Sequence, residues 1–370
     1  MGAPGSRRWT AGISVVVLTA TVLAGCTTGT VTGTSSGTSS SGVAPRSPSE
    51  TAGTASETPV DPLVAPSASV LTNLDGHLRI LRADGTGGKV AVPSIDAEGT
   101  QDEVLLGDWS PDGNRLSFTR VDRSGTILRA SVWVANSDGS GARQVYSCPA
   151  PCQRAGIAAW SPGGDQLAYV VTDTDASRTV GVRSAVEVVS VASGRPRVVV
   201  ESRDRLVDFA YPRWSPDGRR LVVQVTRLKE PLSATSDGSG APSVAVVDVA
   251  GPPGQAPRVL APQLPGGHPD WSWKTDTIIF ATNDPEVVQQ DGAERNLWTV
   301  RPDGSELRQV TRFVRPAMAA QPSWTSDGTI AFLHCVAMPE CYLAYATADG
   351  SVVQTPQQLA GLWPRVKPVA

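Results

Sequence analysis

The 370-residue sequence has little charge, few aromatic side chains and only three histidines. Charged residues make up 18% of the chain, and the net charge of -3 argues against a nucleic-acid binder. A mean hydropathy of -0.11 excludes a polytopic membrane protein. Only 5% of the residues are aromatic, but ten of them are tryptophan, and glycine and proline number 36 and 30. This composition indicates many short strands joined by turns.

The first 26 residues have the order of an export signal. Arg7 and Arg8 precede an uncharged apolar run, residues 13–23, which is too short to be a comfortable transmembrane helix. The run ends in Leu-Ala-Gly-Cys26, which resembles the signal of a bacterial lipoprotein. This resemblance implies that residues 1–25 are removed and that the Cys26 sulfur receives a diacylglyceryl group. An ordinary signal peptide followed by a chance cysteine is the alternative.

Residues 26–66 are expected to form a lipid-anchored stalk. After Cys26 the segment consists largely of Thr, Ser, Gly, Ala and Pro, and it has no apolar periodicity. Such a segment cannot bury enough apolar surface to offset the entropy lost on ordering. We therefore expect a disordered stalk that holds residues 67–370 away from the membrane, on its extracytoplasmic face.

A five-residue pattern recurs through the rest of the chain. It begins as Trp109-Ser-Pro-Asp-Gly, returns closely at Trp160 and Trp214, and has weaker copies at Trp271 and Trp324, at spacings of 51, 54, 57 and 53 residues. These five residues are called the repeat tryptophans below. Apolar residues follow at alternate positions after each one, which is typical of a half-buried strand. A regular period of this length indicates a repeat architecture.

Each copy continues with two more alternating runs separated by an Asp-Gly turn, as at Asp138-Gly139 and Asp303-Gly304. Asp-Gly between such runs is a hairpin signal. Four strands per copy predict an all-β fold, a β-propeller of four-stranded antiparallel blades. Residues 69–93 supply three further strands, and the tail near 362–369 is expected to pair with them and close a ring of six blades. Five blades with an independent hairpin are the competing interpretation.

These patterns resemble the TolB-type, WD-like β-propeller repeat. The resemblance rests on the Trp-Ser-Pro-Asp-Gly turn, the apolar strand after it and the Asp-Gly-x-x-x-Arg-Gln-Val ending of a copy, and it covers residues 67–370. It implies a fold and leaves the function open, because such propellers occur in Tol-complex periplasmic proteins, in lipoproteins and in peptidases of the prolyl oligopeptidase group.

Four cysteines remain after Cys26, and they fall in two predicted long loops. In an exported protein an even number favours disulfides. We expect the local pairs Cys148–Cys152 and Cys335–Cys341 among three possible pairings. Zinc is the alternative, but no second cluster of Cys or His has the spacing of a zinc site. No metal and no cofactor is therefore expected.

The predicted mouth of the central channel is the natural place for a binding site. The innermost strand of each blade runs toward its repeat tryptophan, so residues just before the tryptophan line this mouth. Six of them are candidates for gripping a polar ligand or a peptide terminus: Asp108, Tyr211, Arg213, His268, Asp270 and Gln321. A wet, hydrogen-bonded channel lining is the alternative interpretation of the same residues.

Catalytic constellations are scarce in the sequence. The three histidines, His77, His268 and His334, lie in different blades, and no Ser-His-Asp order falls on a strand, turn and helix. We therefore favour a lipid-anchored binding or scaffold module, without enzymatic activity, for an envelope protein, peptide or glycan. The alternative is a propeller enzyme, a polysaccharide lyase or hydrolase, that uses acidic or His residues at the channel mouth. Nucleic acid is not an expected partner.

Overall fold

The computed structural model describes ten stretches of the chain. They are residues 68–74, 77–92, 103–122, 129–149, 152–175, 180–233, 238–283, 294–337, 340–358 and 362–369. The predicted signal peptide (1–25), Cys26 and the stalk (26–66) lie outside these residues. All regular elements in the described part are strands, and no helix there is long and apolar enough to cross a membrane.

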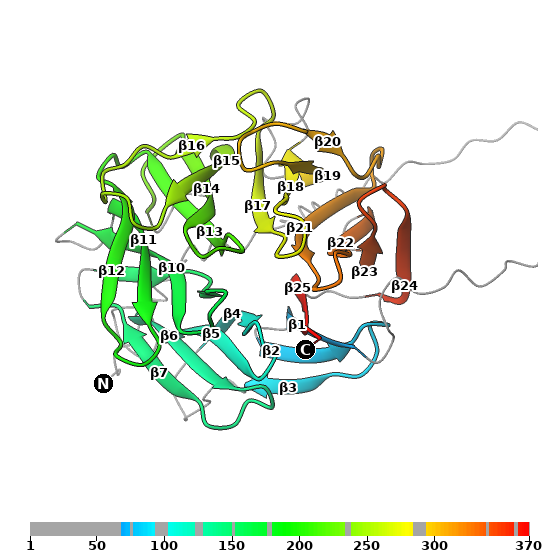
Figure 1. Ribbon diagram of the computed structural model, residues 1–370, viewed down its shortest axis with the longest axis horizontal. Coiled ribbons are helices and arrows are strands. Elements are labelled where there is room, and N and C mark those ends of the chain that lie inside the picture. The colour runs from blue at the N-terminus through cyan, green and yellow to red at the C-terminus, as the bar shows by residue number, and fades with distance from the viewer. Residues whose placement is uncertain are drawn as a thin grey trace, which may run out of the picture.

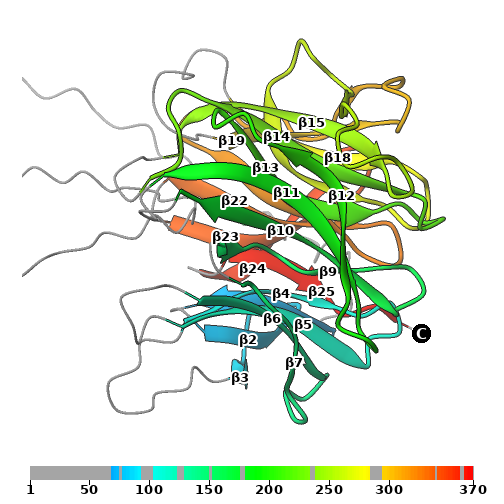
Figure 2. The same cartoon turned by 90° about the vertical axis from the view of Figure 1, so that its left-hand side faces the viewer.

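The strands form six antiparallel sheets arranged in a ring (Figure 1), which Figure 2 shows turned by 90°. The first three blades are built as follows. Blade 1 contains β25 (Leu362–Val366), β1 (Ser69–Leu74), β2 (His77–Arg82) and β3 (Lys89–Val92). Blade 2 contains β4 (Glu103–Trp109), β5 (Arg115–Asp122), β6 (Arg129–Asn136) and β7 (Arg143–Ser147). Blade 3 contains β8 (Cys152–Ala155), β9 (Ala159–Trp160), β10 (Gln166–Thr174), β11 (Gly181–Ser190) and β12 (Pro196–Ser202).

The other three blades repeat the arrangement. Blade 4 contains β13 (Val207–Trp214), β14 (Arg220–Leu228), β15 (Gly240–Asp248) and β16 (Arg258–Val259). Blade 5 contains β17 (Gly266–Trp271), β18 (Ile278–Asn283), β19 (Glu294–Val300) and β20 (Arg308–Gln309). Blade 6 contains β21 (Met318–Trp324), β22 (Ile330–Ala337), β23 (Glu340–Ala346) and β24 (Val352–Gln358). In blade 3 the innermost strand is divided into β8 and β9, which both pair with β10.

The two ends of the propeller close the ring in blade 1. The C-terminal strand β25 pairs antiparallel with β1, with Val366 opposite Val70 and Arg365 opposite Leu71. Figure 1 shows β25 at the centre of the ring beside β1. The predicted six-bladed ring and its closure are confirmed, and the alternative of five blades with a separate hairpin is wrong. Closure leaves blade 1 with the same four-stranded sheet as its neighbours.

The hydrophobic core lies between neighbouring blades. One cluster joins Val132 of blade 2 to Trp160 of blade 3, and another joins Val186 of blade 3 to Trp214 of blade 4. Four repeat tryptophans are buried, whereas Trp324 is half-buried against its cluster. Each blade therefore buries its apolar face on the next blade, as strands with one apolar face require.

The Trp-Ser-Pro-Asp-Gly segment forms a tight turn at the end of an innermost strand. In blade 2 the Ser110 hydroxyl donates to the Asp112 carboxylate at 2.5 Å and accepts from the Arg115 backbone N–H at 2.9 Å. Gly113 has a φ of 66°, a conformation that disfavours side chains with a Cβ. Ser215, Asp217 and Gly218 repeat these features in blade 4. These turns fix where each innermost strand stops, and with it the residues that face the ring axis.

Candidate functional site at the ring axis

A backbone irregularity recurs three residues before the tryptophan position. The pairing register of the innermost strand shifts at this point in blades 1, 4, 5 and 6. The residues there have a φ between 50° and 54°, which is uncommon for residues other than glycine, and each precedes a proline: Tyr211, His268, Gln321 and Trp363. Such bulges commonly redirect side chains at functional sites.

Four charged side chains meet around the ring axis, each one residue before the tryptophan position of its blade. Arg213 of blade 4 places Nε 3.3 Å from Oδ1 of Asp270 in blade 5, and Nη1 4.0 Å from Oδ2 of Asp108 in blade 2. Arg365 of blade 1 places Nη1 3.0 Å from Oδ2 of Asp270. Two arginines and two aspartates thus form a layer with no net charge, called the ionic layer below.

The ionic layer has a regular order around the ring. Arg213 and Arg365 come from opposite blades, 4 and 1, and Asp108 and Asp270 come from opposite blades, 2 and 5. The remaining two positions carry small side chains, Ala159 in blade 3 and Ser323 in blade 6. With Ala159 between their blades, Arg213 reaches past it to Asp108, and Arg365 likewise reaches past Ser323 to Asp270.

Three aromatic rings lie together next to the ionic layer. Tyr211 and His268 are neighbours with ring centroids 4.2 Å apart, and Trp363 lies 6.1 Å from Tyr211 and 6.0 Å from His268. Because Trp363 comes from blade 1 and Tyr211 from blade 4, these contacts cross the axis. The Gln321 side-chain oxygen accepts the Trp363 backbone N–H at 2.8 Å, which fixes the start of β25. These rings are called the aromatic layer.

Burial shapes the electrostatics of the ionic layer. It raises the pKa of Asp108, against the lowering effect of Arg365 and Arg213. Burial and the positive charge of Arg365 together lower the pKa of Arg213 to about 10. Arg213 therefore stays charged at neutral pH, and the pairing of each arginine with a carboxylate offsets part of the cost of burying both.

The structure brings all six predicted residues to the axis, in two layers. Asp108, Arg213 and Asp270 share the ionic layer, while Tyr211 and His268 share the aromatic layer, which Gln321 borders. Arg213, Asp270 and Gln321 are buried, and Asp108 is half-buried. The residues contact one another across the axis as well as lining it.

Sequence reasoning missed Trp363 and Arg365, which complete the two layers. The signal was present, because Trp363-Pro-Arg-Val366 has the form of Tyr211-Pro-Arg-Trp214. Valine occupies the position of the repeat tryptophan in this copy, so a search that begins from tryptophan does not find it. The tail was expected to supply a strand, but its side chains were not expected at the axis.

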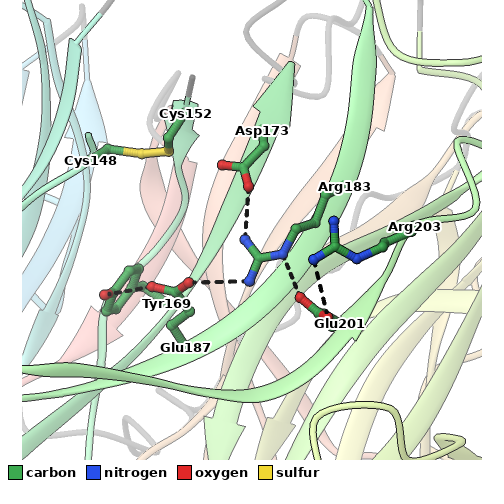
Figure 3. Close-up of polar contacts among 8 residues, drawn as sticks. All are labelled: Cys148, Cys152, Tyr169, Asp173, Arg183, Glu187, Glu201 and Arg203. Atoms are coloured by element: carbon green, nitrogen blue, oxygen red, sulfur yellow. Dashed lines mark hydrogen bonds and ion pairs between the residues drawn. A yellow bond between two sulfur atoms is a disulfide. The ribbon is translucent and has the colours of Figure 1, made fainter. Parts of the chain in front are cut away.

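A second polar cluster, also missed, lies in blade 3 (Figure 3). The Arg183 guanidinium contacts three carboxylates: Asp173 at 3.0 Å, Glu201 at 2.5 Å and Glu187 at 3.5 Å. The buried Tyr169 hydroxyl donates to Glu187 at 3.1 Å. These residues belong to β10, β11 and β12, so the cluster ties three neighbouring strands together. Burial and the nearby negative charge of Glu187 raise the pKa of Tyr169.

The cysteines are joined in the two local pairs. Cys148 is bonded to Cys152 and Cys335 to Cys341, with Cα atoms 5.5 Å and 3.9 Å apart. The first disulfide lies beside the Arg183 cluster (Figure 3). Within the described stretches, no three His, Cys, Asp or Glu side chains are grouped so as to hold a metal ion.

The other two histidines lie away from the axis. His77 opens β2, and His334 lies in β22, where it stacks on Phe313 at 4.2 Å and shares a hydrogen bond with Gln354 at 2.6 Å. His268 is thus the one axis histidine within the described part of the chain, and its nearest ring is that of Tyr211.

The described strands define the class of protein as a six-bladed β-propeller, and solved structures of TolB are similar to it. TolB from Acinetobacter baumannii matches 82% of this chain and 67% of its own length, with a TM-score of 0.57 and 14% identity. A putative TolB from Agrobacterium tumefaciens matches 81% and 92%, with a TM-score of 0.50 and 16% identity. A puromycin-hydrolyzing peptidase from Mycobacterium tuberculosis matches 80% of this chain and 44% of its own, with a TM-score of 0.50 and 19% identity.

No protein-family model and no curated protein matches the sequence. At identities below 20%, the structural likenesses establish the fold of this chain. They confirm the resemblance to the TolB-type repeat that the tryptophan pattern indicates.

Proposed function

We propose that this chain is a lipid-anchored extracytoplasmic β-propeller that serves as a binding or scaffold module for an envelope protein, peptide or glycan. The observation that supports a binding role most directly is the pairing of Asp270. Its two carboxylate oxygens are engaged by Arg213, Arg365 and the Trp324 backbone N–H. A carboxylate held in this way is a structural group and a poor candidate for acid–base chemistry.

The sequence before the propeller supports the proposed location. A basic start, a short apolar run and Leu-Ala-Gly-Cys26 resemble a lipoprotein signal, and the segment 26–66 has the composition of a flexible stalk. Lipidation of Cys26 would place the propeller on the extracytoplasmic face of the cell membrane. The expected result of Cys26→Ser is a shift of the chain from the membrane fraction to the soluble fraction.

One observation favours the alternative, a propeller enzyme. Asp108 is half-buried, and burial raises its pKa, as in carboxylic acids that donate protons in catalysis. The peptidase likeness spans less than half of the peptidase chain, so it lends the alternative no catalytic residues. We therefore keep the binding role as the proposal and test it against turnover.

Capture of a partner tests the proposed function. Cells that produce the full-length, lipid-anchored chain are crosslinked, and the chain is isolated from membranes and analysed by mass spectrometry. We expect one envelope protein or glycan-bearing component to be captured reproducibly, and to be reduced with Cys26→Ser. Failure to capture any reproducible partner from crosslinked membranes would contradict the binding role.

A further inference from the structure

Both carboxylate oxygens of Asp270 have close partners at the ring axis. Its Oδ1 faces Arg213 Nε at 3.3 Å, and its Oδ2 faces Arg365 Nη1 at 3.0 Å and accepts the Trp324 backbone N–H at 2.7 Å. Two guanidinium groups and one backbone N–H therefore contact the Asp270 side chain, which is 9% exposed.

Asp108 occupies the equivalent position on the opposite side of the ring and has fewer close contacts with hydrogen-bond donors and cations. Its Oδ1 accepts the Trp109 backbone N–H at 2.9 Å. Its Oδ2 has Arg213 Nη1 as its ion-pair partner at 4.0 Å, which is too long for a hydrogen bond. The Asp108 side chain is 18% exposed, twice the value for Asp270. Relative to Asp270, Asp108 has no guanidinium nitrogen within hydrogen-bond distance and is more exposed, although it is still largely buried.

The cations already at the axis cannot supply this contact. Arg365 is paired with Asp270. Arg213 Nε lies 3.3 Å from Asp270 as an ion pair without a hydrogen bond, and Arg213 Nη1 donates to the Pro212 carbonyl. The nearby Lys367 ammonium lies over the Trp109 ring, 5.5 Å from its centroid. Turning either arginine toward Asp108 would break its contact with the buried Asp270, which is costly.

We propose that Asp108 is the binding residue for a cationic side chain, that of an arginine or lysine in an extended segment of the partner polypeptide. The incoming group would occupy the place at Asp108 Oδ2 that the second guanidinium holds at Asp270. Asp108 lies one residue before the end of β4, next to the turn at 110–114, so the partner would approach from the face that bears these turns.

The electrostatics of the layer agree with this assignment. The four charges of the ionic layer cancel, yet burial raises the pKa of Asp108, so its carboxylate is compensated incompletely. A further cation in direct contact with Oδ2 would add to the effect of Arg365 and Arg213 and lower this pKa. The inference rests on the proposed binding function and specifies its partner as a basic polypeptide segment.

The direct test uses small peptides of known charge. Binding of acetyl-Gly-Arg-Gly-amide and acetyl-Gly-Lys-Gly-amide to the full chain in detergent is measured by calorimetry. Gly-Gly-Gly-amide, whose only cation is its amino terminus, separates side-chain from terminal recognition. We expect the Arg or Lys peptide to bind at least tenfold more tightly than the same peptide with citrulline in place of arginine.

Asp108→Asn provides the matched change in the protein, since it removes the charge and keeps the shape. We expect it to weaken peptide binding at least tenfold, whereas Asp138→Asn in an exposed turn leaves binding within twofold. Equal binding by the Asp108→Asn chain, equal binding of the citrulline peptide, or no binding to the unaltered chain would overturn the proposal. If Asp108→Asn does not fold, the citrulline comparison decides the question with the unaltered chain.

Capture separates this inference from the proposed function. We expect the partner captured by the unaltered chain to be lost with Asp108→Asn and retained with Asp138→Asn. A partner retained equally by both variants overturns the assignment of Asp108 and leaves the binding function standing. No partner with the unaltered chain contradicts the binding function itself.

Discussion

Arg365 Nη1 lies 3.0 Å from Asp270 Oδ2, and this contact joins the last strand of the chain to blade 5. The same strand, β25, pairs with β1 and carries Trp363 into the aromatic layer. The same strand therefore closes the ring and completes both axis layers. A chain without β25 would lack the innermost strand of blade 1 and members of both axis layers.

Arg365→Met is expected to destabilise the fold strongly. Both partners are about nine-tenths buried, and removing one partner of a buried pair typically costs about 3–5 kcal/mol. The free energy of unfolding can be followed by tryptophan fluorescence in urea. Arg308→Met is the control, because Arg308 is 74% exposed in its pair with Glu306 and its loss should cost less than about 0.5 kcal/mol. Equal effects of the two changes would show that the axis pair contributes nothing.

Trp109→Ala tests the role of the repeat tryptophans. Trp109 is 4% exposed, and its indole N–H donates to the Arg365 carbonyl at 3.0 Å, so it packs blade 2 against the closing strand. Large-to-small changes of this kind cost about 3–5 kcal/mol. Trp273→Ala removes a tryptophan that is 44% exposed in the blade 5 turn and should have little effect. Chemical denaturation of the two variants would show a similar loss if the repeat tryptophans were not core residues.

Much of the fold could be predicted from the sequence, because five copies begin with a tryptophan and most of them continue with a related turn. The hydrogen bonds and the glycine φ of that turn involve residues close together in the chain, so the turn can be recognised from a short sequence pattern. The sixth copy was found only through its strands, since Val366 replaces the tryptophan.

The pairing within the axis could not be predicted in the same way. Which of the axis residues meet depends on which blades are opposite, and that follows from the number of blades and the closure. The Arg183 cluster is similar, because Asp173 lies opposite Arg183 only once the register of β10 and β11 is known. In both cases the sequence shows which residue types are present, but it does not show which residues pair with one another.

Arg183→Met should destabilise blade 3. Arg183 is 13% exposed and is surrounded by Asp173, Glu187 and Glu201, so its removal leaves carboxylates that repel one another. We expect the free energy of unfolding to decrease by about 3–5 kcal/mol, because the network is largely buried. The control is Arg203→Met, since Arg203 also contacts Glu201 but is 75% exposed. A loss no greater than that of the control, measured in urea, would contradict a structural role for the cluster.

The turns predict a loss of stability in acid. Hydrogen bonds from Ser110 to Asp112 and from Ser215 to Asp217, together with backbone N–H donors, lower the pKa of both carboxylates below 3.8. A carboxyl group whose pKa is lower in the folded state stabilises the fold above the unfolded value and loses that effect as the pH falls through the folded value. We expect the midpoint temperature of thermal unfolding to decrease as the pH is lowered from about 5 to about 2.

Asp217→Asn should reduce this dependence on pH, whereas Glu230→Gln on the exposed surface should leave it unchanged. The measurement is a series of thermal unfolding experiments from pH 7 to pH 2. A profile for Asp217→Asn that coincides with that of the unaltered chain would show that the turn carboxylates do not cause the acid sensitivity.

The cysteine pairing can be checked by mass spectrometry of unreduced peptides. The fold predicts one peptide pair linked through Cys148 and Cys152 and another through Cys335 and Cys341. Closing such short loops stabilises by roughly 2 kcal/mol each at most. A link between Cys148 and Cys335, or between Cys152 and Cys341, would exclude the local pairing.

The central claim is that the axis is a binding surface and not a catalytic one, and turnover tests it most directly. The full chain is assayed on a panel of glycans and peptides beside the Asp108→Asn and His268→Ala variants. The binding role predicts no turnover that depends on these residues. Turnover of any substrate by the unaltered chain that either variant abolishes, with its fold retained, would contradict the binding role and establish the enzyme.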